Sequence, residues 1–134
     1  MKLDATPLGN AVQRLREGLA RHQREPMDEQ VRDGLIQRLE VTYELSHRLL
    51  RRYLKETAAS PDAIDDLAFA DLIRTGKAQG LLRSGWPEWR RFREMRTCTS
   101  HTYAAAAAER VVAAIPEFLE EAAHLYGELH RHIA

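Results

Sequence analysis

The sequence has little of what several large classes of protein require. It contains a single cysteine, Cys98, which excludes a disulfide framework and any metal site built from several cysteines. No uncharged apolar run approaches the roughly 18 residues of a membrane span, and the first ten residues lack the apolar core of a signal peptide. We therefore expect a soluble, cytoplasmic protein with no membrane partner.

The charge is balanced, and the remaining composition is that of a globular protein. Lysine and arginine together number 20, as do aspartate and glutamate, so any electrostatic function must come from local patches. Hydrophobic residues make up 44% and charged residues 30% of the 134 positions, which argues against intrinsic disorder. A chain of this length predicts one domain, residues 1–134, with one core.

Helical periodicity runs through nearly the whole chain, and no strand pattern competes with it. Helices are expected over about Pro7–Arg24 and Asp28–Ala58, from Ser60-Pro61 to Leu72, from Pro87 through Met95, and over about Ala104–His130. Three glycines mark a loop before the fourth of these helices, namely Gly76, Gly80 and Gly85. The pattern predicts an all-α, up-and-down antiparallel bundle of four to five helices.

The polar segment from Arg96 to Tyr103 carries the most information about function. Arg96 and His101 are five positions apart, about 140° around a continuous helix, so they converge only if the helix breaks between them. Residues that favour such a break follow Arg96, namely Thr99, Ser100 and Thr102. His101 and Tyr103 would then begin the last helix, where free N–H groups attract an anion such as phosphate. The alternative is a helix junction whose His and Tyr satisfy local hydrogen bonds.

A basic stripe follows one face of the second helix. Arg48, Arg51, Arg52 and Lys55 are spaced i, i+3, i+4 and i+7. Two interpretations stay open: a solvated face near a helix C-terminus, which the helix dipole favours, or a surface that tracks a phosphate backbone.

Other polar groups predict less. Glu40 and Glu44 are four apart on the second helix and could pair, although such carboxylates are more often solvated. Histidines near the C-terminus lie among acidic residues, namely His124, His130 and His132. Cys98 and His101 would supply only two ligands. We therefore expect no metal site and no cofactor.

Several segments resemble one known family. Residues 33–45, DGLIQRLEVTYEL, resemble a helix with the pattern D-x-x-I-Q-R-F-E-F-T-F-E-L in the nucleotidyltransferase substrate-binding family, which comprises HEPN-domain, HepT-like toxins. Ser60-Pro61 resembles that family's S-P-R-D-V-I helix start. Trp89 and the segment from Arg96 to Tyr103 resemble its W…R-N-x-x-S-H-x-Y pattern. The resemblance spans about Val31 to Leu129, in register.

The resemblance implies a homodimeric, HEPN-like helical bundle, with a minimal nucleotidyltransferase (MNT type) as partner and RNA as substrate. It implies that Arg96 and His101 match the R-x4-6-H motif of HEPN ribonucleases and that Tyr103 accepts AMP from the nucleotidyltransferase, which silences the toxin. Thr97 departs from the pattern, because the family usually has Asn there.

The residue types suit metal-free RNA cleavage. That reaction needs a base, an acid and positive charge on the phosphate, roles that His101 and Arg96 can fill. One chain offers one histidine at this site, so two chains meeting here would supply both base and acid. The seam of the last helix, which runs through Val111, Ile115 and Phe118 to Leu125, predicts the dimer surface.

Three hypotheses follow. The first is a metal-independent endoribonuclease toxin with Arg96 and His101 as catalytic residues, Tyr103 as the modified residue, and the basic stripe as an RNA-binding surface. The second is a non-catalytic subunit that binds a nucleotide or another substrate for a nucleotidyltransferase. The third is a helical adaptor in which the motif only shapes a dimer interface.

Overall fold

The computed structural model describes residues 3–101 and 103–133, and within them the secondary structure is entirely helical. The elements are α1 (Thr6–Arg24), α2 (Glu29–Thr57), α3 (Pro61–Asp65), α4 (Phe69–Ala78), α5 (Trp86–Cys98), a 3-10 turn η1 (Thr99–His101) and α6 (Ala105–Ile133). The all-α prediction is confirmed. No helix in the described part of the chain combines the length and the apolar composition that a membrane span requires.

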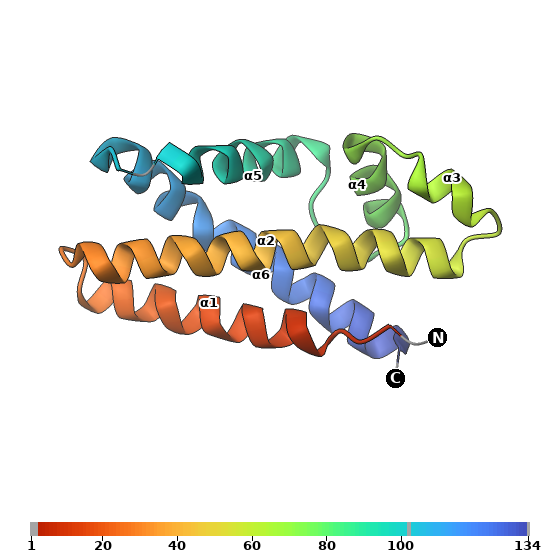
Figure 1. Cartoon of the computed structure of the whole chain (residues 1–134). Coiled ribbons are helices and arrows are strands. Elements are labelled where there is room, and N and C mark those ends of the chain that lie inside the picture. The colour runs from red at the N-terminus through yellow and green to blue at the C-terminus, as the bar shows by residue number, and fades with distance from the viewer. Residues whose placement is uncertain (1–2, 102, 134) are drawn as a thin grey trace.

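The four long helices run alternately up and down, with α3 and α4 connecting the second to the third (Figure 1). Helix α2 lies at the centre and contacts α1, α3, α4 and α6, while α5 packs on α6. Asp28 begins α2 by accepting hydrogen bonds from the backbone N–H groups of Gln30 and Val31. The up-and-down order predicted from the sequence is confirmed.

The expected third helix is in fact two short helices, so the described residues hold six α-helices rather than four or five. Arg51 of α2 donates hydrogen bonds to the carbonyl oxygens of Ile64 and Leu67, at 2.8 and 3.2 Å. These bonds satisfy carbonyls that a continuing helix would have used, so the chain turns there. Ser60 precedes α3 as expected, but its side chain forms no capping hydrogen bond.

The expected loop glycines also differ among themselves. Gly80 has a φ of +78° and forms the turn after α4, as a loop glycine should. Gly76 is buried inside α4 instead, where a Cβ would lie 3.1 Å from side-chain atoms of Leu50 and Leu82. The absence of a side chain at Gly76 therefore allows close packing, and the loop prediction was wrong there.

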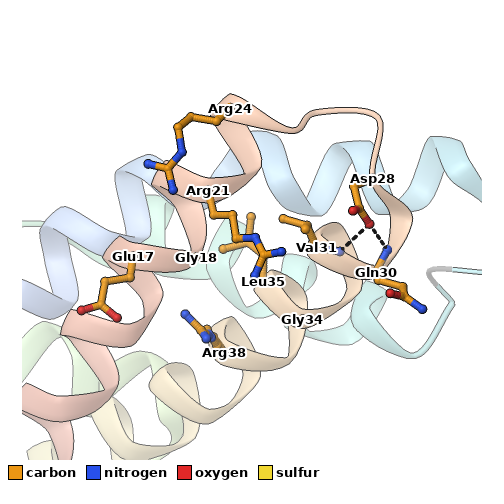
Figure 2. Close-up of a pocket in the computed structure, with 10 residues that line it drawn as sticks. All are labelled: Glu17, Gly18, Arg21, Arg24, Asp28, Gln30, Val31, Gly34, Leu35 and Arg38. Atoms are coloured by element: carbon orange, nitrogen blue, oxygen red, sulfur yellow. Dashed lines mark hydrogen bonds between the residues drawn. The ribbon is translucent and has the colours of Figure 1, made fainter.

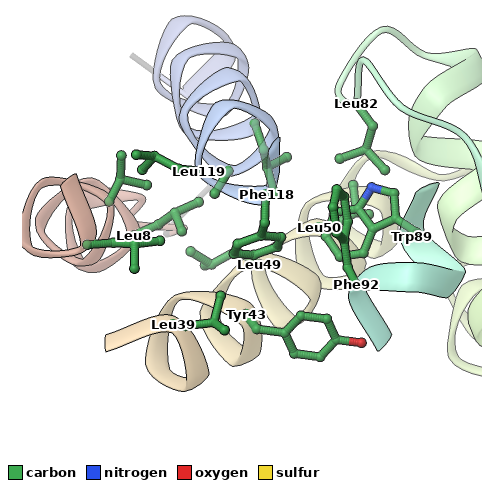
Figure 3. Close-up of a cluster of buried hydrophobic side chains, with 14 of the residues drawn as sticks. Leu8, Leu39, Tyr43, Leu49, Leu50, Leu82, Trp89, Phe92, Phe118 and Leu119 are labelled. Atoms are coloured by element: carbon green, nitrogen blue, oxygen red, sulfur yellow. The ribbon is translucent and has the colours of Figure 1, made fainter. Parts of the chain in front are cut away.

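The core is centred on aromatic rings contributed by α2, α5 and α6 (Figure 3). Trp89, Phe92 and Phe118 are fully buried and meet edge to face, with centroids 5.2 to 5.9 Å apart. The seam of α6 faces this core, so its prediction as a helix-packing surface is confirmed. Its assignment to a dimer surface was wrong, because residues from Val111 to Leu129 along it are covered within one chain.

Among the described residues, Glu121 is the charged residue buried inside the bundle. Glu121 of α6 is 2% exposed and accepts hydrogen bonds from the backbone N–H groups of Arg83 and Ser84, both at 2.8 Å. It also accepts one from the indole Nε1–H of Trp89 at 3.0 Å. A buried carboxylate needs such donors to offset its lost hydration, and these three attach α5 and the loop before it to α6.

Candidate functional site

The segment between α5 and α6 breaks where the sequence predicted. Helix α5 ends at Cys98, a single 3-10 turn follows over Thr99–His101, and α6 begins at Ala105. His101 is exposed at the end of this turn, and its carbonyl oxygen accepts from the N–H of Ala104 at 3.4 Å. The break therefore presents the imidazole to solvent instead of continuing the α5 surface.

Thr99 connects the break to Arg96. Its buried hydroxyl donates to the Arg96 carbonyl at 2.7 Å and accepts from Arg96 Nη1 at 2.9 Å. Ser100 similarly donates to the carbonyl of Thr97 at 3.1 Å. The hydroxyls of Thr99 and Ser100 thus bind carbonyls of α5 rather than N–H groups at the start of α6. Thr102, the third residue expected to favour the break, lies outside the described residues. The local pairing of Thr99 orients the guanidinium of Arg96.

The guanidinium of Arg96 faces two carboxylates of α2. Its Nη1 lies 3.8 Å from Glu40 Oε2 and its Nε lies 3.5 Å from Glu44 Oε1. The side chain is 33% exposed, and its Nε is buried without a hydrogen-bond partner among the described residues. The sequence favoured a solvated pair at Glu40 and Glu44. Their i, i+4 spacing places both carboxylates on one face of α2, and this was the signal that they share one partner. Arg96 therefore meets α2 at ion-pair distances rather than through hydrogen bonds, and its side chain remains partly exposed.

Glu44 also connects Arg96 to the basic stripe. Its Oε2 lies 3.2 Å from His47 Nε2 and 3.7 Å from Arg48 Nη2. Burial lowers the pKa of His47, while the charge and hydrogen bond of Glu44 act in the opposite direction. The His47 ring packs edge to face against Tyr43 and Phe69, so its burial comes from the aromatic core.

Tyr103 and Thr97 complete the motif. Tyr103 is 88% exposed in the turn before α6, so its hydroxyl is accessible to a large partner. Thr97 is exposed on α5, and its hydroxyl donates to the carbonyl of Arg93 at 3.1 Å. The threonine in place of the family's asparagine thus bonds to its own helix.

The four residues of the basic stripe lie along one face of α2, and each has a partner. Arg48 and Arg52 lie 3.7 Å from Glu44 and Glu56, Lys55 lies 2.8 Å from Asp65, and Arg51 binds the two carbonyls described above. Together with His47 and Asp65 they line a shallow pocket of about 280 Å³. The positive charge of the stripe is therefore partly compensated within the chain.

No group of three or more His, Cys, Asp or Glu side chains in the described part of the chain is arranged to hold a metal ion. The candidate site places a guanidinium, an imidazole and a phenol around a helix break. These groups can bind a phosphate ester, exchange protons and accept a transferred group.

The structure is that of a helical-bundle protein that exposes a histidine and a tyrosine at a helix junction. Comparisons with known proteins show to which family this bundle belongs. The family described as "Nucleotidyltransferase substrate binding protein like" matches residues 3–131. A solved structure from Haemophilus influenzae, described as the fold of a substrate binding domain of a nucleotidyltransferase, aligns with a TM-score of 0.88 and 30% identity, over 95% of this chain and 99% of that one. This chain belongs to the nucleotidyltransferase substrate binding protein-like family.

A curated relative carries a second description. The "Probable ribonuclease HepT" of Haemophilus influenzae is 37% identical over 98 residues. The match covers 73% of this chain and 66% of the relative, slightly under two thirds of its length. The family resemblance inferred from the sequence is therefore confirmed, and the two descriptions correspond to two of the hypotheses raised there.

Proposed function

We propose that this protein is a metal-independent endoribonuclease, the toxin of a pair whose antitoxin is a nucleotidyltransferase. The observation that carries the proposal is the helix break between Arg96 and His101. The break exposes the imidazole of His101, and the guanidinium of Arg96, five residues earlier, is partly exposed. The relative named as a probable ribonuclease adds support. In this proposal the protein acts in the cytoplasm, Arg96 and His101 are catalytic, and the basic stripe from Arg48 to Lys55 adds affinity for RNA.

The proposed chemistry uses the ribose of the RNA itself. An imidazole takes the proton of a 2′-hydroxyl, whose oxygen attacks the adjacent phosphorus, and the bond from phosphorus to the 5′-oxygen breaks. A second, protonated imidazole gives its proton to that leaving oxygen, which leaves a 2′,3′-cyclic phosphate and a free 5′-hydroxyl. Arg96 stabilises the charge on the phosphorane. The two proton transfers explain why the proposal needs two copies of His101.

The proposal therefore includes a symmetric homodimer with the junctions of two chains facing each other. Because the α6 seam is covered within one chain, the contact has to come from surface residues near the junction. Tyr103, an aromatic side chain in the turn before α6, is 88% exposed and could contribute to this contact. Light scattering at tens of micromolar should report a dimer, and a monomer under those conditions would contradict the composite site.

Silencing is proposed to act through Tyr103. The phenol oxygen attacks the α-phosphorus of ATP bound to the nucleotidyltransferase, pyrophosphate leaves, and the phenol proton passes to solvent. The attached AMP carries a negative charge that competes with RNA phosphate for Arg96. The high exposure of Tyr103 supports this role, because the hydroxyl must enter another enzyme's active site.

A second candidate function is a non-catalytic subunit that presents a nucleotide or another substrate to a nucleotidyltransferase. The contacts of Arg96 with Glu40 and Glu44 favour it, because they reduce the positive charge available to a scissile phosphate. The description of the Haemophilus influenzae structure as a substrate binding domain also favours it.

Cleavage of single-stranded RNA in EDTA tests the proposal. Wild-type protein should leave 2′,3′-cyclic or 3′-phosphate ends, and Arg96→Ala and His101→Ala should each lose roughly 10²- to 10⁴-fold in rate. Arg93→Ala is the control, since it removes a neighbouring arginine of α5 outside the motif. Cleavage that survives both substitutions would assign the activity to another site, and Thr97→Asn tests whether threonine limits the rate.

Incubation with the partner nucleotidyltransferase and ATP tests the silencing step. Intact-mass spectrometry should show the addition of about one AMP or a few to the wild type. Tyr103→Phe should accept none and should keep its ribonuclease activity in the presence of the partner. Tyr53→Phe, a half-buried tyrosine of α2, is the control. AMP found only on other residues would favour the substrate-binding alternative.

A further inference from the structure

Two adjoining pockets form a groove between α1 and α2. The first, about 440 Å³, lies at the turn that joins the helices, and the second, about 370 Å³, shares Gly34 and Arg38 with it and extends to Val41. We call this surface the arginine groove, because its walls include Arg14, Arg21, Arg24 and Arg38.

The charges in the groove favour an anion. Four arginines line it, against two acids, Glu17 and Asp28. Both acids have partners: Asp28 caps α2 and Glu17 accepts a hydrogen bond from Gln13. Figure 2 shows Arg21 and Arg38 reaching into the space between the helices, while Asp28 turns toward the α2 backbone.

Three of the four arginines form no ion pair within the described part of the chain. Arg21 pairs with Glu25 at 2.8 Å, but Arg14, Arg24 and Arg38 take part in none of the ion pairs formed by the described residues. One nitrogen of Arg38 donates to the Arg14 carbonyl at 2.7 Å, which orients the rest of its guanidinium. The groove thus differs from the basic stripe of α2, where each cation already has a partner.

The shape of the groove indicates a chain rather than a compact anion. It is elongated along the helix pair, and Gly34 leaves room at its centre, since a Cβ there would meet nothing within 4 Å. Guanidinium groups spaced along a groove bind successive phosphates of one strand. Figure 1 shows the turn between α1 and α2 at the same end of the bundle as the junction of α5 and α6.

We propose that the arginine groove binds the phosphodiester backbone of single-stranded RNA and anchors a strand whose next segment reaches the helix junction. The choice of RNA rests on the proposed function, whereas the choice of phosphate rests on the groove itself. A free nucleotide carries the same phosphate chemistry, so the experiment must separate the two.

Salt-dependent RNA binding tests the charges. Fluorescence anisotropy with an oligonucleotide of about ten nucleotides is measured on His101→Ala protein, so that the RNA is not consumed. Adding Arg14→Gln and Arg24→Gln should reduce the slope of log affinity against log salt by about 1.4, or 0.7 for each lost phosphate contact. Arg16→Gln with Arg74→Gln removes the same charge from exposed sites outside the groove and should leave the slope unchanged. The proposal would be overturned if the groove pair and the control pair changed the salt slope equally, or if the groove pair left it unchanged.

Filling the groove tests its shape. Gly34→Leu should weaken RNA binding and flatten its salt dependence by a similar amount. Gly127→Leu is the control, because Gly127 is likewise a helical glycine at which a Cβ would meet nothing within 4 Å, and it lies outside the groove. Circular dichroism melts of both variants check that the bundle still folds. RNA binding by folded Gly34→Leu at wild-type strength would overturn the proposal.

ATP separates the two sources of phosphate. ATP should neither displace the RNA nor distinguish Gly34→Leu from the parent protein. ATP that binds the parent, displaces the RNA and fails to bind Gly34→Leu would reassign the groove to a mononucleotide. RNA cleavage by the wild type is measured separately. The results can therefore contradict RNA binding in the groove while supporting the ribonuclease proposal, or contradict the ribonuclease proposal while supporting RNA binding in the groove.

Discussion

Glu121 and the pair Glu40 and Glu44 are carboxylate sites of opposite character. Glu121 is buried and accepts three hydrogen bonds of 2.8 to 3.0 Å from N–H donors. Glu40 and Glu44 are more than one third exposed and lie 3.5 to 3.8 Å from the guanidinium of Arg96. The distances from Glu121 to its three N–H donors are those of good hydrogen bonds. The distances from Glu40 and Glu44 to the Arg96 guanidinium are longer and correspond to ion pairs.

The difference separates a site that stabilises the fold from one that can exchange partners. A carboxylate removed from water is stable only with all its donors in place, so Glu121 fixes the loop before α5. A partly hydrated ion pair contributes little, so an incoming phosphate can replace Glu40 and Glu44 at Arg96 at small cost. We expect substitutions at Glu121 to affect folding and substitutions around Arg96 to affect binding.

The largest effect is expected at Glu121. Glu121→Ala leaves three N–H donors without their acceptor and should lower the free energy of unfolding by about 3 kcal/mol or more, at roughly 1–3 kcal/mol for each unsatisfied buried donor. Urea denaturation followed by circular dichroism measures this loss. Glu120→Ala, at an adjacent exposed side chain, should stay within about 0.5 kcal/mol of wild type. Equal effects at the two positions would remove the distinction between the sites.

A smaller effect, on binding, is expected at Glu44. Glu44→Gln removes the negative charge nearest Arg96 and should raise affinity for single-stranded RNA about two- to fivefold, the range of a surface ion pair. Anisotropy titrations at low salt measure it, again with His101→Ala protein. Glu56→Gln, which removes an equivalent charge beside Arg52, is the control. Weaker RNA binding by Glu44→Gln would show that the carboxylate positions Arg96 instead of occupying it.

The smallest effect concerns pH. Burial lowers the pKa of His47, so the unfolded chain binds a proton more readily than the folded one. The contribution of His47 is therefore complete above its unfolded pKa of about 6.5 and is lost as the pH falls through the lower folded value. Wild-type stability should fall more steeply than that of His47→Gln when the pH is lowered from about 7 to 5. Parallel thermal melts compare the two slopes, and His130→Gln, at an exposed position of α6, is the control. Identical slopes for wild type and His47→Gln would contradict the prediction.

Much of the fold could be predicted because its signals are local. The helical periodicity predicted the up-and-down bundle and most helix boundaries. Predictions failed where a distant residue decides the outcome. Arg51 ends α3 from another helix, and Gly76 is buried because Leu50 and Leu82 approach it. Neither contact leaves a pattern in the neighbouring sequence.

In the candidate site, too, the features with local sequence signals were predicted and those decided by distant residues were not. The spacing of Arg96, His101 and Tyr103 and the run of hydroxyl residues predicted a helix break, and the break is present. The partners of Arg96 on α2 could not be read from the segment itself, because they lie more than fifty positions earlier in the chain. The same holds for the basic stripe, whose compensation by Asp65 and by the carbonyls of Ile64 and Leu67 depends on how the connection folds back.

By itself, the sequence determined that this chain is an all-α bundle, that its motif falls at a helix break, and to which family it is similar. These properties depend on hydrophobic periodicity and on neighbours within a few residues, which a linear pattern records. Only the tertiary structure decided which charges remain available to a ligand. An arginine loses its availability when a distant carboxylate or carbonyl meets it, as on the α2 stripe, and keeps it where two helices leave a groove open, as between α1 and α2.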